Sequence, residues 1–360
     1  MTLAPMTLAQ WVAARGSSAV VHLDVAGAGR VSRAALAAEV KHLIREQQVG
    51  GYPAEAKAAP LVDAGRAALG ALLGLDADAV AYQDGAGTAF AVLMEAWPLA
   101  AGARIGWLQS EYGGNAAVLR RLAASRDWTL VDLPVDPLGR ILDVPAGLDL
   151  VTFPQVPSQR GIAQPVGQVL STGVPVLLDV AQSLGQVAVP PGCAAYVGTS
   201  RKWLCGPRGI GFAVVAPDWG EQLAPPPTPA AVANTGVRRF EAPEAHVAGR
   251  VGLAVAVQEW TPDVIAESAR LASYARTVLD GGGGWRVVEP VDEPTAITTL
   301  FSPAGADPFA ARELLQQRAF VTSAVPVSRA ADMTAPVLRV STAAWLTEAD
   351  IDGAAAVLSG

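Results

Sequence analysis

One lysine constrains this chain more than any other residue in its sequence. Lys202 lies between two short apolar segments, residues 195–198 and 212–215, which have the length and composition of buried strands. A lysine between buried strands is unusual, because removing an ammonium group from water is costly. Thr199 and Ser200 precede it, and a turn rich in glycine and proline follows. Two interpretations are open: an exposed hairpin lysine, or a lysine that forms a Schiff base while Thr199 or Ser200 helps to hold a phosphate.

An acidic residue follows another apolar segment earlier in the chain. Residues 174–178 form another apolar segment, and Asp179 follows it directly. Functional groups of α/β sheets gather at the carboxyl ends of the strands. An acid and a lysine at two such ends suit pyridoxal phosphate (PLP), because the carboxylate keeps the pyridine nitrogen protonated and the amine carries the aldehyde carbon. The sequence therefore predicts that Asp179 and Lys202 hold PLP between them.

The spacing around these residues resembles the class V aminotransferase family of fold-type I PLP enzymes. The motifs are Asp179-x-x-Gln182, Thr199-Ser200-Arg201-Lys202 and Gly206-Pro207-x-Gly209-x-Gly211. The family includes cysteine desulfurases, selenocysteine lyases and isopenicillin-N epimerase-like enzymes. The resemblance implies an α/β fold, in which a large domain with a mostly parallel, seven-stranded sheet is joined to a smaller α+β C-terminal domain. We expect residues 20–250 to form the large domain, and residues 1–19 and 251–360 the small one.

The phosphate of the cofactor has a candidate site before a predicted helix. Gly85-Ala86-Gly87-Thr88 is a glycine turn at the position of the family's phosphate loop. The N-terminus of a helix binds phosphate through backbone N–H groups and the helix dipole. The resemblance implies that Ala86 and Gly87 donate N–H groups and Thr88 a hydroxyl, and that Thr199 or Ser200 adds a further hydroxyl.

The resemblance also assigns the contacts of the cofactor ring. Tyr112 stands where desulfurases have a histidine that stacks on the pyridine ring, and Gln182 belongs to the same set of cofactor-binding residues. A tyrosine can hold the ring but titrates too high to copy the acid–base role of histidine. Gly113 and Gly114 are expected to leave space above the cofactor. The alternative for Tyr112 is an ordinary loop tyrosine packed on the core.

Three residues are candidates for binding the substrate. Arg339 begins the family's closing Arg-x-Ser motif, whose arginine binds the substrate α-carboxylate in a bidentate manner that suits a guanidinium. Ser158 replaces an asparagine that lies near the cofactor's phenolic oxygen. Tyr52 belongs to a predicted loop, residues 50–53, that can reach the partner subunit's active site; otherwise it is a packed loop tyrosine. Arg160 replaces a threonine, and either pairs with an anionic group of the substrate or is a surface cation.

Composition limits the partners and the compartment. The chain has 360 residues, of which 51% are hydrophobic, and a net charge of −7, which argues against a nucleic-acid surface. No apolar run is long enough for a membrane span, and the first ten residues do not resemble a secretory signal. With only Cys193 and Cys205, we expect a reducing, cytoplasmic compartment. Three histidines do not make a rich histidine metal site, and we predict no metal.

The resemblance implies a homodimer with active sites between subunits. Relatives have a threonine that touches the partner subunit's phosphate where this chain has Glu244. A carboxylate there would repel a phosphate dianion. Arg239 or Arg250 could replace that contact.

The absence of a cysteine before the Arg-x-Ser strand limits the reactions that we expect. Desulfurases attack sulfur with a cysteine on a loop before the Arg-x-Ser strand, but residues 321–336 contain none. Over its whole length the chain is similar to the PLP-dependent C–S lyases of ergothioneine biosynthesis, which cleave hercynylcysteine sulfoxide. We therefore expect β-elimination from a small amino-acid sulfoxide, releasing pyruvate and ammonia, with Lys202, Asp179 and Tyr112 as the catalytic residues and Lys202 removing the Cα proton.

Other reactions stay open. They are transamination, a cysteine desulfurase or selenocysteine lyase that uses Cys193 or Cys205, and a PLP-fold scaffold without turnover. The last is disfavoured because a scaffold needs no combined set of acid, lysine and arginine. The trimethylammonium group of the expected substrate would favour aromatic faces, for which Tyr52, Phe90 and Trp203 are candidates.

Overall fold

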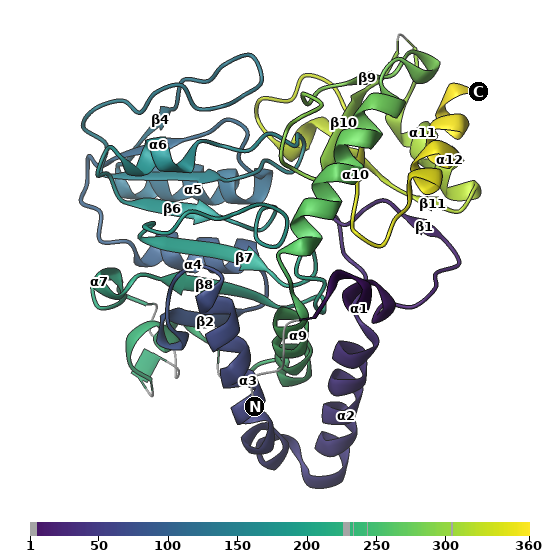
Figure 1. The fold of residues 1–360 in the computed structure, drawn as a ribbon. Coiled ribbons are helices and arrows are strands. Elements are labelled where there is room, and N and C mark those ends of the chain that lie inside the picture. Colours follow the sequence, from purple (N-terminus) through teal and green to yellow (C-terminus); the bar gives the residue numbers. More distant parts are fainter. Residues whose placement is uncertain (1–5, 226–230, 233, 243, 304) are drawn as a thin grey trace.

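The structure is a computed structural model that describes residues 6–225, 231–232, 234–242, 244–303 and 305–360. Its largest element is a seven-stranded sheet, seen at the left of Figure 1. In order across the sheet, the strands are β2 (Val80–Gln83), β8 (Gly211–Val215), β7 (Ala195–Thr199), β6 (Val176–Asp179), β5 (Leu150–Pro154), β3 (Arg104–Trp107) and β4 (Thr129–Asp132). All pairings are parallel except the two that β8 makes. The predicted mostly parallel, seven-stranded sheet is confirmed.

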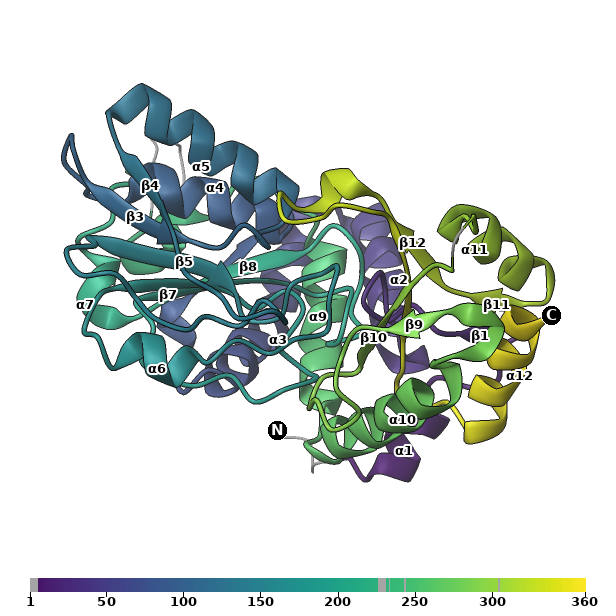
Figure 2. The same cartoon turned by 90° about the horizontal axis from the view of Figure 1, so that it is seen from above.

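Helices cover both faces of this sheet, which is why its central strands are apolar throughout. One face is covered by α4 (Ala86–Ala96) and α5 (Gly113–Arg126), and the other by α3 (Gly51–Ala71), α6 (Val166–Leu170) and α9 (Val247–Glu259). Figure 2 shows these two layers. Successive residues of a strand face opposite sides, so Tyr196 packs in the core under α3 and α9, whereas Val197 packs under α4 and α5.

A second, smaller sheet is built from the C-terminal third of the chain. It is antiparallel, in the order β12 (Ser323–Val325), β13 (Val337–Ser341), β10 (Ile297–Phe301) and β9 (Arg286–Val287). Helices α10 (Asp263–Leu279), α11 (Pro308–Gln317) and α12 (Glu348–Ser359) pack around it. Shorter elements lie between these; they are α1 (Leu8–Ala13), α7 (Pro217–Gly220) and the 3-10 helices η1 (Ala77–Ala79), η2 (Gly236–Phe240), η3 (Gly282–Gly284) and η4 (Val327–Arg329).

The N-terminal segment is joined to this smaller sheet. Strand β1 (Val21–His22) pairs in parallel with β11 (Phe320–Val321), and Asp24 bridges to Ser341 at the end of β13. The division expected at residues 20 and 250 stays a prediction: β1 pairs with a C-terminal strand, and α9 runs through the expected second boundary.

The predicted loop at residues 50–53 is wrong, because a helix begins there. Helix α2 (Arg33–Val49) starts at the predicted cap, where Ser32 accepts a hydrogen bond from the Ala35 N–H, and it ends at Gly50. Gly50 has φ 84°, a conformation that favours glycine, and α3 starts at the next residue. Pro53 is tolerated in the first turn of α3, since the N–H groups there have no partner within the helix. Among the described residues, no helix is long and apolar enough to span a membrane.

Candidate active site

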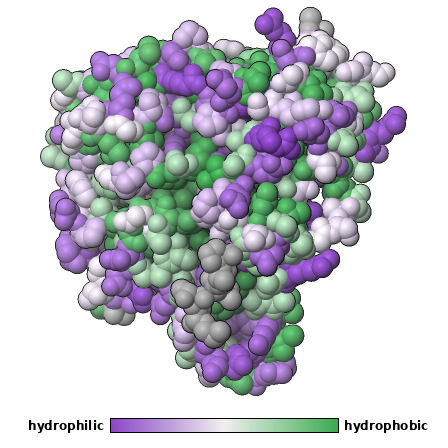
Figure 3. Space-filling model, in the orientation of Figure 1, coloured by the Kyte–Doolittle hydropathy of each residue, from purple (hydrophilic) through white to green (hydrophobic). Residues whose placement is uncertain are grey.

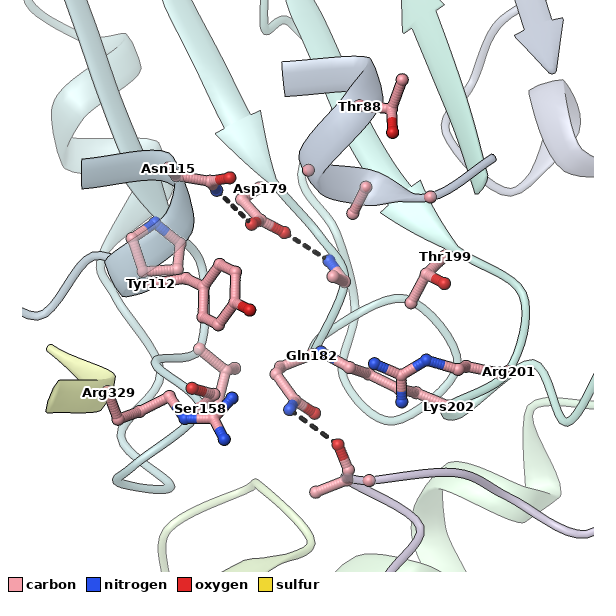
Figure 4. A pocket seen from close by; sticks show the side chains of 18 of the residues that line it. Thr88, Tyr112, Asn115, Ser158, Asp179, Gln182, Thr199, Arg201, Lys202 and Arg329 are labelled. Atoms are coloured by element: carbon pink, nitrogen blue, oxygen red, sulfur yellow. Dashed lines mark hydrogen bonds between the residues drawn. The ribbon is translucent and has the colours of Figure 1, made fainter. Parts of the chain in front are cut away.

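A cavity of about 400 Å³ lies where the carboxyl ends of β5, β6 and β7 meet the smaller sheet. This volume is in the range of small-molecule sites. All the predicted site residues except Ser200 and Tyr52 line it: Ala86, Gly87, Thr88, Tyr112, Ser158, Asp179, Gln182, Thr199, Lys202 and Arg339. Most of them are labelled in Figure 4. Segments far apart in the sequence therefore meet at one edge of the sheet, as the strand-end argument predicts.

Asp179 is the buried last residue of β6. One carboxylate oxygen accepts a hydrogen bond from the Ala181 N–H at 2.7 Å, and the other accepts one from Asn115 Nδ2 at 3.0 Å. Burial raises the pKa of Asp179, while Lys202 and these two donors act in the opposite direction. Each oxygen keeps a free lone pair, so the carboxylate can accept a further N–H from a ligand.

A second buried carboxyl group lies behind Asp179 and was not assigned a role from the sequence. Glu111 is fully buried, and its Oε1 accepts hydrogen bonds from the Tyr112 N–H at 2.8 Å and from Asn115 Nδ2 at 3.1 Å. Burial and the nearby Asp179 raise the pKa of Glu111 to about 8, which favours its protonated form. Asn115 thus gives both amide hydrogens to carboxyl groups. The four-residue spacing from Glu111 to Asn115 at the start of α5 was the signal available in the sequence.

Lys202 lies in the turn between β7 and β8. Burial lowers its pKa to about 7; Arg201, Arg339 and Arg329 add to this, although Asp179 opposes it. An amine with such a pKa is partly neutral at physiological pH and can attack an aldehyde. Its backbone is closely packed, because a Cβ at Gly29 would lie 2.5 Å from the Lys202 carbonyl oxygen.

The N-terminus of α4 provides a site for a phosphate. Helix α4 begins at Ala86, and its N-cap residue, Gly85, supplies no capping side chain, so the N–H groups of the first turn are free for a ligand. Gly211 allows β8 to approach this turn, since a Cβ there would lie 2.3 Å from the Gly85 carbonyl carbon. Thr88 and Thr199 add hydroxyl groups to the cavity wall.

Gln182 is held rigidly on the floor of the cavity. Its Nε2 donates to the Ala26 carbonyl oxygen at 2.9 Å, and its Oε1 accepts from Trp203 Nε1 at 2.9 Å. Both ends of the amide are engaged, which fixes its orientation toward a cofactor.

Tyr112 caps the start of α5, and 43% of its surface is exposed. Its ring faces the cavity (Figure 4). The glycines that follow also make room within the chain, and the space that they are expected to leave above the cofactor stays a prediction. A Cβ at Gly114 would lie 2.7 Å from the Tyr112 ring, and one at Gly113 would lie 2.8 Å from the Ser328 carbonyl oxygen. They make room for the tyrosine ring and for the backbone of η4.

Arg339, on β13, is buried and already has oxygen partners. It donates to the Ser158 carbonyl oxygen at 2.7 Å, to Asp24 Oδ1 at 2.9 Å and to Ser323 Oγ at 3.3 Å. Asp24 therefore lies where a substrate carboxylate would bind, an arrangement not predicted from the sequence. The Ser158 hydroxyl has no hydrogen-bond partner among the described residues.

Two predicted site residues do not reach the cavity. Ser200 is fully buried, and its hydroxyl donates to the Pro207 carbonyl oxygen. Its side chain therefore points into the turn rather than toward the cavity. Arg201, which was given no role from the sequence, lines the cavity. Tyr52 lies in the first turn of α3 with 83% of its surface exposed, so in this chain it is outside the cavity.

The other aromatic candidates for binding the substrate's ammonium group also lie outside the cavity. Phe90 and Trp203 are buried in the core and do not line the cavity.

Arg160 pairs with Asp332 at 2.8 Å, so it is neither a free surface cation nor a residue of the cavity wall. Among the residues that the structure describes, no group of three or more histidine, cysteine or acidic side chains could hold a metal ion.

The residues present fit PLP. A buried carboxylate lies at one side of the cavity, an amine of lowered pKa at another and an uncapped helix N-terminus at a third (Figure 4). These are the partners that a pyridine nitrogen, an aldehyde and a phosphate require.

Residues 21–353 match the family described as Aminotransferase class-V. The chain belongs to the class-V aminotransferase family. It is 41% identical to a probable hercynylcysteine sulfoxide lyase of Mycobacterium tuberculosis (strain CDC 1551 / Oshkosh), over 97% of this chain and 92% of that protein. It is 28% identical to an isopenicillin N epimerase of Amycolatopsis lactamdurans, over 72% and 74% of the two chains.

Solved structures share the fold. A complex of the cystine C–S lyase C-DES with its product cysteine persulfide superposes with a TM-score of 0.85 at 18% identity, over 95% of this chain and 98% of that one. A cysteine desulfurase from Thermococcus onnurineus gives 0.85 at 15% identity, over 94% of each chain. The predicted fold class and the PLP cofactor are confirmed, and so is the general enzyme class, a PLP-dependent carbon–sulfur lyase.

Proposed function

We propose that this class-V enzyme cleaves the carbon–sulfur bond of a cysteine conjugate sulfoxide, hercynylcysteine sulfoxide, as a step of ergothioneine biosynthesis. The observation that carries this is a cavity where a lysine and a buried acid face the PLP site and no cysteine lines the wall, within the described residues. The identity of 41% with a probable hercynylcysteine sulfoxide lyase supports the particular substrate.

The chain's own residues supply the acid–base and binding steps. Lys202, with its lowered pKa, removes the Cα proton of the substrate. Asp179 keeps a proton on the ring nitrogen, and Arg339 binds the α-carboxylate. Bound PLP supplies an electron sink for the charge that develops at Cα. The Cβ–S bond then breaks with its electron pair going to sulfur. With one water, the overall products are a sulfenic acid, pyruvate and ammonium.

A desulfurase mechanism is disfavoured by the positions of both cysteines. Cys193 and Cys205 are free but buried, and neither lines the cavity. Burial raises the pKa of Cys193 to about 12 and also raises the pKa of Cys205. A thiolate is the nucleophile in persulfide formation, so neither residue is suited to attack sulfur in the cavity. The two free thiols also accord with the reducing, cytoplasmic compartment that we propose.

We infer that the enzyme acts as a homodimer. Helix α2 projects from the body of the molecule (Figure 1) and exposes Leu36, Val40, Leu43 and Ile44, which share one helical face. Figure 3 shows hydrophobic residues among the hydrophilic ones on this projecting part. An exposed apolar stripe of this kind is typical of a protein interface. A second copy of the chain would cover it, and could bring Tyr52, on the adjoining turn of α3, to the neighbouring active site.

The cross-subunit phosphate contact stays a prediction. Glu244 is exposed. Arg250 pairs with Glu241 at 3.3 Å, and Arg239 donates to backbone carbonyl oxygens of its own chain. Neither arginine lines the cavity, so their own-chain contacts give no support for a replacement role.

The test of the proposed reaction is pyruvate release from purified enzyme with hercynylcysteine sulfoxide, S-alkyl cysteine sulfoxides, cystine and cysteine. We expect pyruvate and ammonium in equal amounts from sulfoxides, and no persulfide on the protein. Pyruvate from none of the sulfoxides would refute the proposal. Persulfide on Cys193 or Cys205 during turnover of cysteine would establish the desulfurase alternative. Absence of any turnover by PLP-loaded protein would favour the scaffold.

A further inference from the structure

Three arginines line the cavity, and two of them have no acceptor. Arg339 is engaged by Asp24, Ser158 and Ser323. The side chains of Arg201 and Arg329 make no hydrogen bond or ion pair within the described part of the chain, although both residues are half-buried. Burial and the charge of Arg339 lower the pKa of Arg329. Partly buried guanidinium groups without counter-ions are suited to bind anionic groups of a ligand.

Arg329 lies away from the phosphate site. In Figure 4 its guanidinium lies beside Ser158 and Tyr112, on the opposite side of the cavity from Thr88 and the start of α4. Arg201, by contrast, follows Thr199 by two residues in the turn that carries Lys202. The position of Arg329 is therefore on the side where the substrate binds.

The segment that carries Arg329 is firmly held. Gly113 allows the backbone of η4 to pack on the start of α5, since a Cβ there would lie 3.3 Å from the Arg329 carbonyl oxygen. Just beyond η4, Asp332 accepts from Ser110 Oγ at 2.6 Å and pairs with Arg160 at 2.8 Å. The guanidinium lies 5.5 Å from the centre of the Tyr112 ring, within the range of a cation–π contact.

We propose that Arg329 selects the substrate by binding a carboxylate on the group attached to sulfur. This inference rests on the proposed function: the phosphate binds at α4 and the substrate's α-carboxylate at Arg339, which leaves Arg329 for a second anionic group. The preferred substrates are thus cysteine conjugate sulfoxides whose departing group is acidic. Asp332 acts as a positioning residue, because it fixes the segment that carries Arg329.

The experiment compares two probes of nearly equal size, S-carboxymethyl-L-cysteine sulfoxide and its neutral amide, S-carbamoylmethyl-L-cysteine sulfoxide. We expect the wild type to prefer the acid about 10-fold to 100-fold in kcat/KM, as for one charge-assisted hydrogen-bonded pair. Arg329→Gln should abolish the preference by raising KM for the acid only, Arg329→Lys should keep part of it, and Asp332→Asn should weaken it less than Arg329→Gln. Arg121→Gln, an exposed arginine on α5 with 65% of its side chain accessible, is the matched control and should change nothing.

The outcomes separate this inference from the proposed function. Pyruvate from neither probe, nor from any other sulfoxide, would refute the function. Equal use of both probes by the wild type would overturn the role of Arg329 and leave the lyase reaction standing. An equal loss on both probes in Arg329→Gln would also overturn it, because the residue would then serve the shared α-carboxylate. Binding of the non-oxidised thioether S-carboxymethyl-L-cysteine, followed by calorimetry, gives a second readout, and its affinity should fall in Arg329→Gln.

Discussion

The two sides of the active-site cavity differ in how completely the fold satisfies their charges. On the acidic side, Asn115 donates to both Asp179 and Glu111, so both carboxyl groups have hydrogen-bond partners without a ligand, although Glu111 Oε2 has none among the described residues. On the cationic side, Arg201 and Arg329 have no acceptor among the described residues. The difference indicates that the acidic side is preorganised for the cofactor, whereas the cationic side is completed by anions that arrive with the ligands. Variants on the acidic side should therefore lower kcat, whereas variants on the cationic side should raise KM.

The largest effect is expected at Asp179. Asp179→Asn removes the carboxylate that we propose to hold a proton on the ring nitrogen, so kcat should fall by about 10²-fold to 10⁴-fold, the usual range for loss of acid–base assistance. The binding constant of the substrate should change little. Steady-state kinetics with a sulfoxide measure this, and Asp218→Asn, on the distant helix α7, is the control. If Asp179→Asn kept the kcat of the wild type, the acidic side would not have the function that we propose for it.

Arg339 should show the opposite pattern. Arg339→Ala removes charge-assisted hydrogen bonds to the substrate carboxylate, each worth about 1.5–3 kcal/mol, so KM should rise about 10-fold to 100-fold. Arg339→Lys should restore only part of the loss, because an ammonium group cannot form the bidentate pair. If kcat fell while KM stayed constant, binding of substrate would not be the function of this side of the cavity.

A smaller effect, about 10-fold, is expected from pH on the capture of PLP by cofactor-free enzyme. Only the neutral amine of Lys202 attacks an aldehyde, and its pKa is lowered to about 7. The neutral fraction should therefore rise from about 10% at pH 6 to about 90% at pH 8. Stopped-flow absorbance at several pH values gives the rate. Lys202→Ala should abolish the violet absorbance, whereas Lys57→Ala, on the surface of α3, should keep it. A rate that still rises steeply above pH 9 would contradict the lowered pKa.

The smallest effect on activity is expected at Glu111, whose ionisation acts on the stability of the fold. Its folded pKa of about 8 is above the ordinary value of 4.5, so the stability that its protonated form contributes is complete below pH 4.5 and is lost as pH rises to about 8. Glu111→Gln cannot ionise and should gain stability relative to the wild type as pH increases across that interval. Urea unfolding at pH 5.5 and pH 8.5 measures the difference. Equal pH dependence in both proteins would show that Glu111 is already ionised.

The parts that could be predicted from the sequence are those set by local pattern. Asp179 and Lys202 follow apolar strands, and parallel strands bring their carboxyl ends together, so their meeting follows from the pattern alone. The start of α3 was missed because Gly50-Gly51-Tyr52-Pro53 was interpreted as a loop, whereas Gly50, with its positive φ, is a hinge between two helices. The direction of the Ser200 side chain was also missed, because it is set by a hydrogen bond to the Pro207 carbonyl oxygen across the same turn.

Residues whose role depends on distant contacts could not be found in this way. Arg329 reaches the cavity because Asp332 is held by Ser110, 222 positions away in the sequence. Nothing near Arg329 in the chain indicates that contact. Glu111 stands four residues before Asn115 in the sequence, but its burial behind Asp179 results from the packing of α5 against the sheet. In both cases the property that matters is created by tertiary structure.

The most direct test of this account is a crystal structure of the enzyme with PLP and the thioether S-carboxymethyl-L-cysteine. We predict that the ring nitrogen lies within hydrogen-bond distance of Asp179, the phosphate at the start of α4, and the two carboxylates at Arg339 and Arg329, with the contacts of Asn115 unchanged. A phosphate bound by Arg329, or a ring nitrogen remote from Asp179, would contradict the account.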